Sequence, residues 1–188
     1  MSRSGQFDPR AEYVVHTDRA AIHRRHGGIL AVHGVLGAAV VAAIIWFEAQ
    51  DLGPLSTLPM LIILVGQIFQ LSWHSFIYGS RVAISEPLTL NHRGFAMNTA
   101  AGRMEVPWEA VTGIAIRRRL RYRMLVLQLH PAAMPGSPGV ETDITPSDWK
   151  RLQRYGGPML GEKGIRENLA DIIAAVDDFS QGRVPVRS

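Results

Sequence analysis

The chain of 188 residues contains no cysteine. Disulfide bonds, zinc sites built on thiolates and thiol nucleophiles are therefore excluded. Charge is also scarce, because charged residues make up 19% of the sequence, whereas about a quarter is usual for a soluble domain. The shortage is concentrated in residues 29–78, which contain two acids, Glu48 and Asp51, and no lysine or arginine. This uneven composition predicts that two parts of the chain face two different solvents.

The sequence also lacks the signatures of the common enzyme classes. It has no phosphate-binding loop, no glycine fingerprint for a dinucleotide, no HExxH zinc motif and no nucleophile elbow. The acids outside the apolar part have no spacing that would pair them for acid–base chemistry, and they include Glu105, Glu109, Glu141, Asp143 and Asp148. We therefore expect a protein that is not an enzyme and that requires no cofactor and no metal.

Two long apolar runs follow each other closely. The run at 29–47 has one strongly polar residue, His33, and the run at 55–78 has no formal charge. Each run is long enough to cross about 30 Å of hydrocarbon as a helix. We predict two transmembrane helices, at about 29–48 and 55–78, which form a hairpin within residues 29–79.

Basic residues flank this hairpin on one side only. Residues 1–28 contain five arginines, the connector between the two runs contains none, and arginines resume at Arg81, Arg93 and Arg103. Because basic residues collect on the cytoplasmic side of a membrane, we expect a protein of the cytoplasmic membrane with both termini in the cytoplasm. The same topology accounts for the net charge of +4, so nucleic acid is not an expected partner.

Polar side chains within the second run recur at i, i+3 and i+7, hence on one helix face. Because polar groups at membrane depth avoid lipid, this face predicts either hydrogen bonds within the hairpin or contact with another membrane protein. The first run has a stripe of small residues at a spacing of four, which allows another helix to approach closely. The predicted partner-binding residues are Gly34, Ala38 and Ala42 in the first run and Gln67, Gln70 and His74 in the second.

His33 and His74 are expected at similar depth in an antiparallel hairpin, since each lies a few residues from the cytoplasmic end of its run. Two interpretations remain open. The histidines can be hydrogen-bonded near the headgroups, which is the more common role, or they can ligate haem or a metal ion. The second interpretation requires a Soret band or bound metal in the purified protein.

After Gly79 the pattern changes from continuous apolar runs to short alternating ones separated by turn residues, as in a β-sheet. Strands are expected at 88–90, 95–98, 103–108, 111–116, 124–129 and 139–144. The fourth and fifth of these are predicted to form a long antiparallel hairpin. Two helical signals follow: Thr145 as N-cap before Pro146, and an apolar stripe over 165–181 that ends at Gly182.

The stretch LTLNHRGFAMNTAAGRMEVPWEAVTGIAI, residues 88–116, resembles the bacterial pleckstrin-homology-like (PH-like) domains that are often attached to paired membrane helices. Its Pro107-Trp108 step is part of that resemblance. The resemblance implies a bacterial inner-membrane protein with a cytoplasmic domain over 81–182 and a short tail at 183–188. It also implies an α+β fold, in which an antiparallel β-barrel or sandwich of six or seven strands is covered by a C-terminal amphipathic helix. It transfers no catalytic residues.

A cluster of arginines lies at the tip of the predicted β-hairpin. Its members are Arg117, Arg118, Arg119, Arg121 and Arg123. One hypothesis is that they bind anionic phospholipid headgroups or a peptide at the inner leaflet, where each base contributes about 1 kcal/mol. We favour a different hypothesis, an accessory or scaffolding subunit of a larger membrane protein complex, because a partner explains membrane-buried amides better than lipid does.

Overall fold

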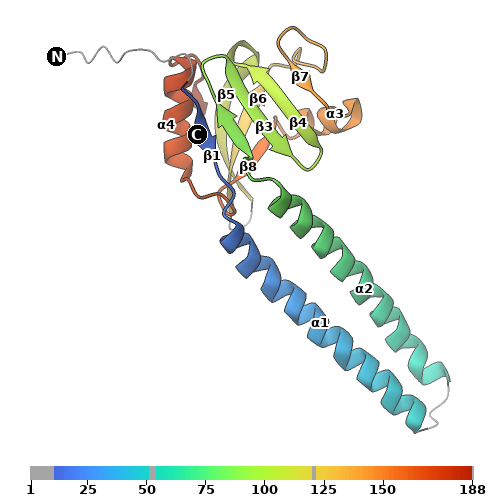
Figure 1. The fold of residues 1–188 in the computed structure, drawn as a ribbon. Coiled ribbons are helices and arrows are strands. Elements are labelled where there is room, and N and C mark those ends of the chain that lie inside the picture. The colour runs from blue at the N-terminus through green and yellow to red at the C-terminus, as the bar shows by residue number, and fades with distance from the viewer. Residues whose placement is uncertain (1–10, 51–53, 120–121, 188) are drawn as a thin grey trace. The chain divides into compact units, whose positions relative to one another are not determined.

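The computed structural model describes residues 11–50, 54–119 and 122–187 (Figure 1). The chain divides into two compact units. Residues 19–83 form a helical hairpin, and the rest of the chain forms a second unit, which we call the sheet domain. The division follows the change of composition along the sequence, because the hairpin contains both apolar runs.

Two long helices form the hairpin. Helix α1 spans Arg19–Ala49 and helix α2 spans Pro54–Ala83, and they run side by side in opposite directions (Figure 1). Both are long and apolar enough to cross a membrane, and the most apolar 18-residue window of each has no buried residue. The predicted spans lie inside these helices, which are longer where the chain enters α1 and where it leaves α2.

The first sheet of the sheet domain has five strands in the order β1-β2-β3-β4-β7, all antiparallel to their neighbours. The strands are β1 Tyr13–Val15, β2 Leu88–Leu90, β3 Gly94–Thr99, β4 Gly102–Pro107 and β7 Glu141–Thr142. Three of them confirm the first three predicted strands, and β7 is a shorter version of the strand predicted at 139–144. Strand β1 belongs to residues 1–28, which were predicted to form an N-terminal segment outside the domain.

The second sheet has four strands in the order β8-β6-β5-β9. The strands are β5 Val111–Arg119, β6 Tyr122–Leu129, β8 Met159–Gly161 and β9 Val186–Arg187. The predicted long hairpin is confirmed, because β5 and β6 pair from Val111 and Leu129 up to Arg119 and Tyr122. Strand β9 pairs with β5 in parallel, so the predicted tail at 183–188 takes part in the sheet.

The prediction left a barrel and a sandwich open, and the described residues do not form a closed barrel. A barrel requires its edge strands to pair with each other, whereas here β1 and β7 are the edges of one sheet and β8 and β9 are the edges of the other. The edge strands have only two or three residues. Such short edges offer too few backbone groups to join the two sheets, so the architecture is two separate sheets with helices.

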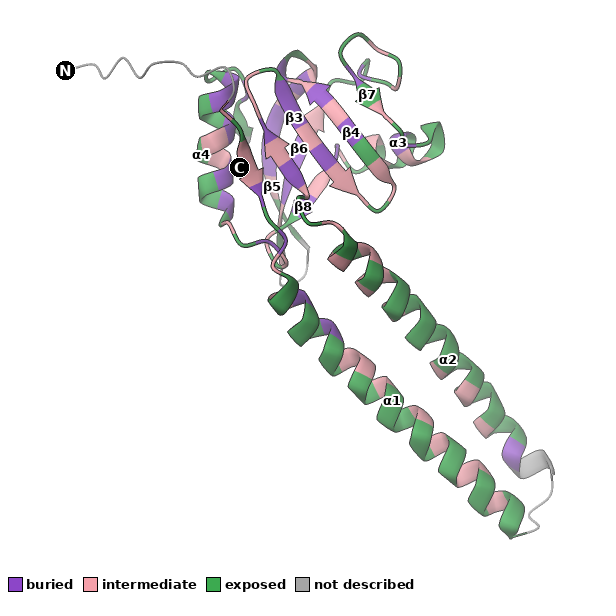
Figure 2. Ribbon diagram, viewed as in Figure 1, coloured by how far each residue is buried: buried purple, intermediate pink, exposed green. Residues whose placement is uncertain are grey.

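The core of the sheet domain gathers apolar side chains from both sheets and from helix α4, Leu169–Ser180. Along β4, Met104 and Val106 are buried while Glu105 between them is not, because successive side chains of a strand point to opposite faces. Figure 2 shows this alternation on the strands and a buried stripe on α4. Helix α4 confirms the predicted C-terminal amphipathic helix, and the chain leaves it through Gln181 in the left-handed region (φ 56°).

Two tryptophans anchor this core, and each has a partner for its indole N–H. Trp108 lies in a short 3-10 turn, η1 (Trp108–Ala110), and donates to the carbonyl of Asn91 at 2.8 Å. Trp149 lies in helix α3 and donates to the carbonyl of Ala133 at 3.0 Å. Both are at least 98% buried. Trp108 and Trp149 therefore both serve in core packing.

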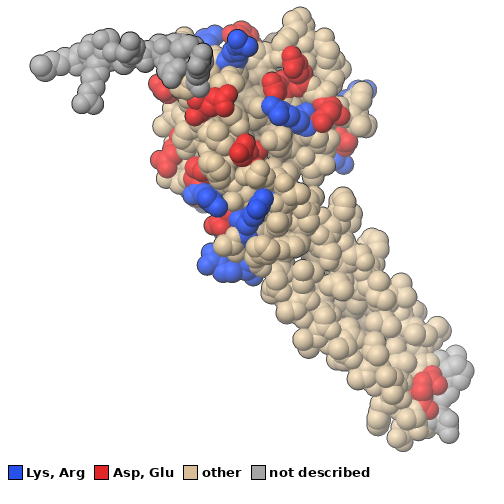
Figure 3. Space-filling view, in the orientation of Figure 1, with Lys and Arg blue, Asp and Glu red and all other residues tan. Residues whose placement is uncertain are grey.

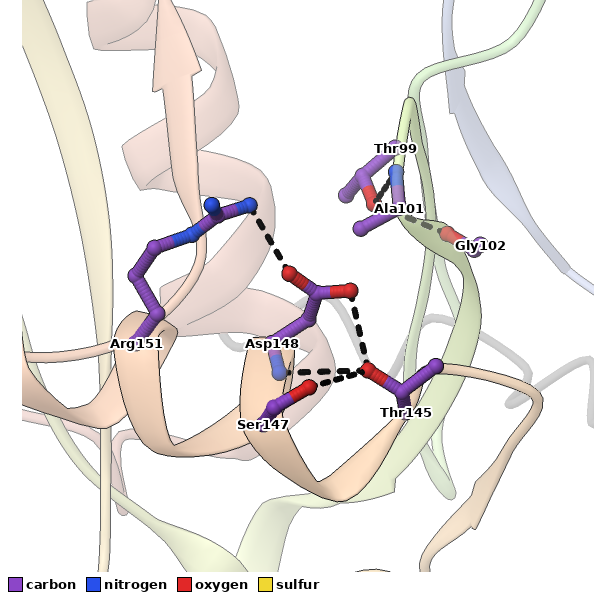
Figure 4. A network of polar contacts seen from close by, with 7 residues as sticks. All are labelled: Thr99, Ala101, Gly102, Thr145, Ser147, Asp148 and Arg151. Carbon is purple, nitrogen blue, oxygen red and sulfur yellow. Dashed lines mark hydrogen bonds and ion pairs between the residues drawn. The ribbon is translucent and has the colours of Figure 1, made fainter.

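Helix α3, Pro146–Arg154, begins at the predicted cap. The Thr145 hydroxyl accepts a hydrogen bond from the Asp148 backbone N–H at 3.2 Å and donates one to the Asp148 carboxylate at 2.9 Å (Figure 4). The same carboxylate pairs with Arg151 at 2.9 Å. The Thr145 hydroxyl thus satisfies one of the free N–H groups of the first turn, and this cap accounts for the start of the helix at Pro146.

Candidate functional site

The polar side chains inside the hairpin contact one another. His33 of α1 and Gln67 of α2 are hydrogen-bonded through Nδ1 and Oε1 at 2.8 Å. The rings of His33 and His74 are stacked, with centroids 5.5 Å apart and planes 28° apart. The two histidines therefore lie at similar depth, as the antiparallel hairpin requires, and Gln67 and His74 are used within the hairpin.

The stacked geometry does not fit axial ligation of haem by His33 and His74. Two axial imidazoles must direct ring nitrogens at one iron from opposite sides, whereas these rings face each other and one nitrogen of His33 is bonded to Gln67. Among the described residues, no group of three or more histidine, aspartate or glutamate side chains is arranged to hold a metal ion. We draw no cofactor chemistry from this pair.

Two further histidines of α1, His23 and His26, lie beside Tyr78 of α2. The Tyr78 hydroxyl is hydrogen-bonded to Nδ1 of His23. The His26 ring lies against the Tyr78 ring, with centroids 5.8 Å apart. His26 is 94% buried, and neither ring nitrogen has a hydrogen-bond partner in the described structure. The sequence gives no signal that His26 is buried, because its burial depends on the packing of α2 against α1.

The outer surface of the hairpin carries the rest of the predicted partner-binding residues. Gly34, Ala38 and Ala42 are all exposed, and a Cβ atom added at Gly34 would meet nothing within 4 Å. The small-residue stripe is therefore not used for packing between α1 and α2. Gln70 is also exposed, and no described residue hydrogen-bonds its amide. The structure thus separates Gln67 and His74, which face inward, from Gln70, which does not.

Two members of the arginine cluster already have structural partners. Arg117 donates to the carbonyl of Tyr155 at 3.0 Å, and Arg123 lies 3.5 Å from the carboxylate of Glu162. Arg118 is exposed and stands directly opposite Arg123 across the β5–β6 ladder. The side chain of Arg119 and the whole of Arg121 lie outside the described residues. The cluster is thus divided between contacts with the domain and exposed charge.

A groove of about 540 Å³ in the sheet domain was not foreseen from the sequence. It runs over the paired ends of β3 and β4, and its charged lining consists of Arg93, Glu105, Glu109 and Glu141. Glu105 stands opposite Glu141 in the β4–β7 ladder, Glu105 pairs with Arg103, and Glu109 pairs with Arg183 at 2.9 Å. Side chains that looked scattered along the sequence therefore gather at one place, although two of the three acids are neutralised by arginines.

The N-terminal strand is tied to the start of α4 by His16 and Glu167. The Glu167 carboxylate accepts hydrogen bonds from the His16 backbone N–H at 2.8 Å and pairs with the His16 ring at 2.9 Å. Burial alone would raise the pKa of Glu167, but the hydrogen bonds from His16 outweigh burial and hold this pKa below its usual value. The pair is structural, and the sequence offers no signal for it, because 151 positions separate the two residues.

Comparison of the chain with protein-family models, with curated proteins and with solved structures gives no match. The resemblance of residues 88–116 to PH-like domains therefore stays a prediction. The geometry itself is what supports a functional proposal: an α+β sheet domain, and two helices able to cross a membrane with unused polar and small residues on their outer surface.

Proposed function

We propose that this protein is a non-catalytic accessory or scaffolding subunit of a larger membrane protein complex. The hairpin crosses the cytoplasmic membrane of a bacterium, both termini lie in the cytoplasm, and a PH-like sheet domain works at the inner surface. Another transmembrane helix packs against the outside of the hairpin. Its contact residues are Gly34, Ala38, Ala42 and Gln70, while Gln67 and His74 hold the hairpin together.

The single observation that carries the proposal is the exposure of Gln70. This residue lies well inside the apolar run 55–78, where a primary amide facing lipid has no partner and is unfavourable. Gln67, one turn away, has such a partner in His33. A hydrogen bond across a helix–helix contact would supply the missing partner for Gln70, with a contribution of about 1 kcal/mol.

The distribution of charge supports the proposed orientation. In Figure 3 the long middle part of the hairpin carries no charged side chain. Arg19, Arg24, Arg25 and Arg81 lie at the end where the chain enters α1 and leaves α2, and Glu48 lies at the opposite end. Because basic flanks stay in the cytoplasm, this arrangement favours the N- and C-termini inside and the connector outside.

The proposal is tested by purifying the chain in mild detergent from its native membrane and measuring stoichiometric partners by native mass spectrometry. Gln70→Leu is expected to weaken retention of the partner about fivefold, the loss of one interhelical hydrogen bond. Ala38→Ile should weaken it further by keeping the helices apart. Ala39→Ile is the matched control, because Ala39 is also exposed but lies outside the small-residue stripe.

Three results would contradict the proposal. One is a wild-type chain that carries no stoichiometric partner. Another is equal retention by Gln70→Leu and wild type, and the third is equal loss in the Ala38→Ile and Ala39→Ile variants. Gln67→Leu is not a useful substitute for Gln70→Leu, because it breaks the bond to His33 and so disturbs the hairpin itself.

A second candidate function uses the arginine cluster as a site for anionic lipid or an acidic peptide. The observation that favours it is the direct opposition of Arg118 and Arg123 in the β5–β6 ladder, since like charges facing each other across strands are unfavourable and an anionic surface would relieve them. We rank it second because Arg117 and Arg123 have partners within the domain. Salt-sensitive binding of the chain to anionic liposomes that is lost in Arg118→Gln would support it.

A further inference from the structure

The groove of the sheet domain has small residues at its floor and charged side chains around it. The floor contains Gly94 and Ala96 of β3, which stand opposite Pro107 and Glu105 of β4. A larger residue in place of Gly94 would displace the backbone, because its Cβ atom would lie 2.0 Å from the Val106 carbonyl oxygen. The groove of about 540 Å³ is therefore a product of the strand pairing, and its volume lies in the range of ligand-binding sites.

Two charged side chains of this groove are accessible and not neutralised. Arg93 lies in the turn before β3 and Glu141 lies in β7, and both residues are exposed. Neither forms an ion pair with another described residue. The other two acids of the lining are each paired with an arginine outside it. The groove thus retains one free charge of each sign.

Arg93 and Glu141 are too far apart to neutralise each other. Glu141 stands in one cross-strand row with Glu105 of β4 and Ala96 of β3, so it is two strands away from β3. Arg93 precedes Ala96 by three positions. With about 4.8 Å between strands and about 3.4 Å per residue, the two Cα atoms are about 14 Å apart. The groove therefore has a positive end at Arg93 and a negative end at Glu141.

We propose that this groove binds an extended peptide segment of a partner protein, with an acidic and a basic side chain four positions apart. The acidic side chain meets Arg93 and the basic one meets Glu141. In an extended segment, side chains at i and i+4 point to the same side and are about 13 Å apart, which matches the separation of the two free charges. The small residues Gly94 and Ala96 leave room for the backbone between them. A single amino acid is too short to reach both ends.

The inference goes beyond the proposed function, since it uses the sheet domain alone and requires neither the membrane crossing nor a partner of the hairpin. The full-length chain is purified in detergent and used to select phage-displayed random seven-residue peptides. We expect the enriched peptides to share one acidic and one basic residue four positions apart. A selection that enriches no peptides, or peptides without this pair, would overturn the proposal.

Reversal of one charge at a time tests each end of the groove. In Arg93→Glu both ends are negative, so the enriched pair should change to two basic residues. In Glu141→Lys both ends are positive, and the pair should change to two acidic residues. Glu12→Lys and Lys150→Glu are the matched controls, because they make the same charge changes at exposed positions outside the groove, and both should select the wild-type pair. An unchanged pair in the two groove variants, or the same change in the controls, would contradict the site.

The dissociation constant of the most enriched peptide tests the groove itself. The peptide is synthesised with a fluorescent label, and its binding is followed by fluorescence anisotropy. Glu141→Gln should weaken binding about three- to fivefold, the effect of one exposed ion pair, whereas Glu12→Gln should leave it unchanged. Ala96→Leu fills the floor without changing a charge and should also weaken binding. Wild-type affinity in Ala96→Leu, or displacement of the peptide by free lysine or glutamate at the same concentration, would contradict an extended peptide as the ligand.

The failure of this site and the failure of the accessory role give different results. A chain that carries no stoichiometric membrane partner but selects the charged pair contradicts the accessory role alone. A chain that keeps such a partner but selects no charged pair contradicts the peptide groove alone.

Discussion

The four tryptophans of the chain divide evenly between its two units, and they are buried in one unit and exposed in the other. Trp108 and Trp149 in the sheet domain expose 2% and 1% of their surface, whereas Trp46 and Trp73 in the hairpin expose 58% and 55%. The buried pair has hydrogen-bond partners for the indole N–H groups. The exposed pair lies toward opposite ends of the hairpin, where amphipathic aromatic side chains would meet the interfaces of the proposed membrane. Tryptophan thus stabilises the sheet domain from inside, whereas in the hairpin it lies on the outer surface.

The contrast extends to all large apolar side chains. In the sheet domain they form one cluster drawn from both sheets and α4. In the hairpin many are exposed, including Val35 and Phe69, each at 70%. Surface of this kind in water would be a large apolar patch of the sort that marks an interface or a membrane-facing region. The comparison therefore supports the proposal that the two units face two different solvents. It can be tested by substituting residues in one unit at a time.

The largest expected effect is the loss of a core tryptophan. Trp108→Ala should lower the free energy of unfolding of the sheet domain by about 3–5 kcal/mol, because it leaves a cavity and orphans the Asn91 carbonyl that accepts from the indole. Trp73→Ala is the matched variant in the hairpin and should change the stability of the domain little. Denaturant unfolding followed by circular dichroism measures both. Equal effects of the two substitutions would contradict the division into a packed domain and a hairpin that is proposed to face lipid.

The next effect is a charge placed on the outside of the hairpin. Ile62 is 67% exposed, and it lies well inside the run 55–78. If the helix is in lipid, Ile62→Arg should disfavour membrane insertion by about 2.5–3.5 kcal/mol, which is measured as the loss of chain from the membrane fraction. If the helix is in water, an exposed arginine is harmless. Val186→Arg, at a position that is 50% exposed in the sheet domain, is the control and should leave the membrane fraction unchanged.

The features that could be predicted from the sequence are those with a local signal. Both apolar helices, strands β2 to β6 and the cap of α3 each have their pattern within a few turns or strand lengths of chain. Strands β1, β8 and β9 could not be predicted, because they have only two or three residues and are defined by distant partners. The same pairing explains why the barrel alternative fails, since the short strands occupy edges that a barrel would need to join.

The candidate site shows the same limit at the level of single side chains. Gln67, Gln70 and His74 share one helix face in the sequence pattern, but at 3.6 residues per turn Gln67 and His74 are about 20° apart whereas Gln70 is about 60° from Gln67. Packing against α1 uses the aligned pair and leaves Gln70 outside. The burial of His26 could not be predicted for a related reason, because it depends on Tyr78 of the other helix. Which polar side chain finds a hydrogen-bond partner depends on the neighbouring helix, and the sequence of one helix alone does not specify that partner.

The smallest expected effect concerns the pairing of His16 with Glu167, which holds the N-terminal strand within the sheet domain. Because the pKa of Glu167 in the folded chain lies below the ordinary value of 4.5, the folded state binds this proton less readily than the unfolded state does. The stabilisation is therefore fully present above pH 4.5 and is lost as the pH falls through the lowered pKa. Denaturant unfolding across this range measures the free energy of unfolding of wild type and of Glu167→Gln. The difference between them should be constant at higher pH and should become smaller in acid. Glu12→Gln removes an exposed carboxylate near the same strand, and its difference in free energy of unfolding from wild type should not change with pH. If the difference for Glu167→Gln is also independent of pH, the carboxylate acts through its shape and not through its charge.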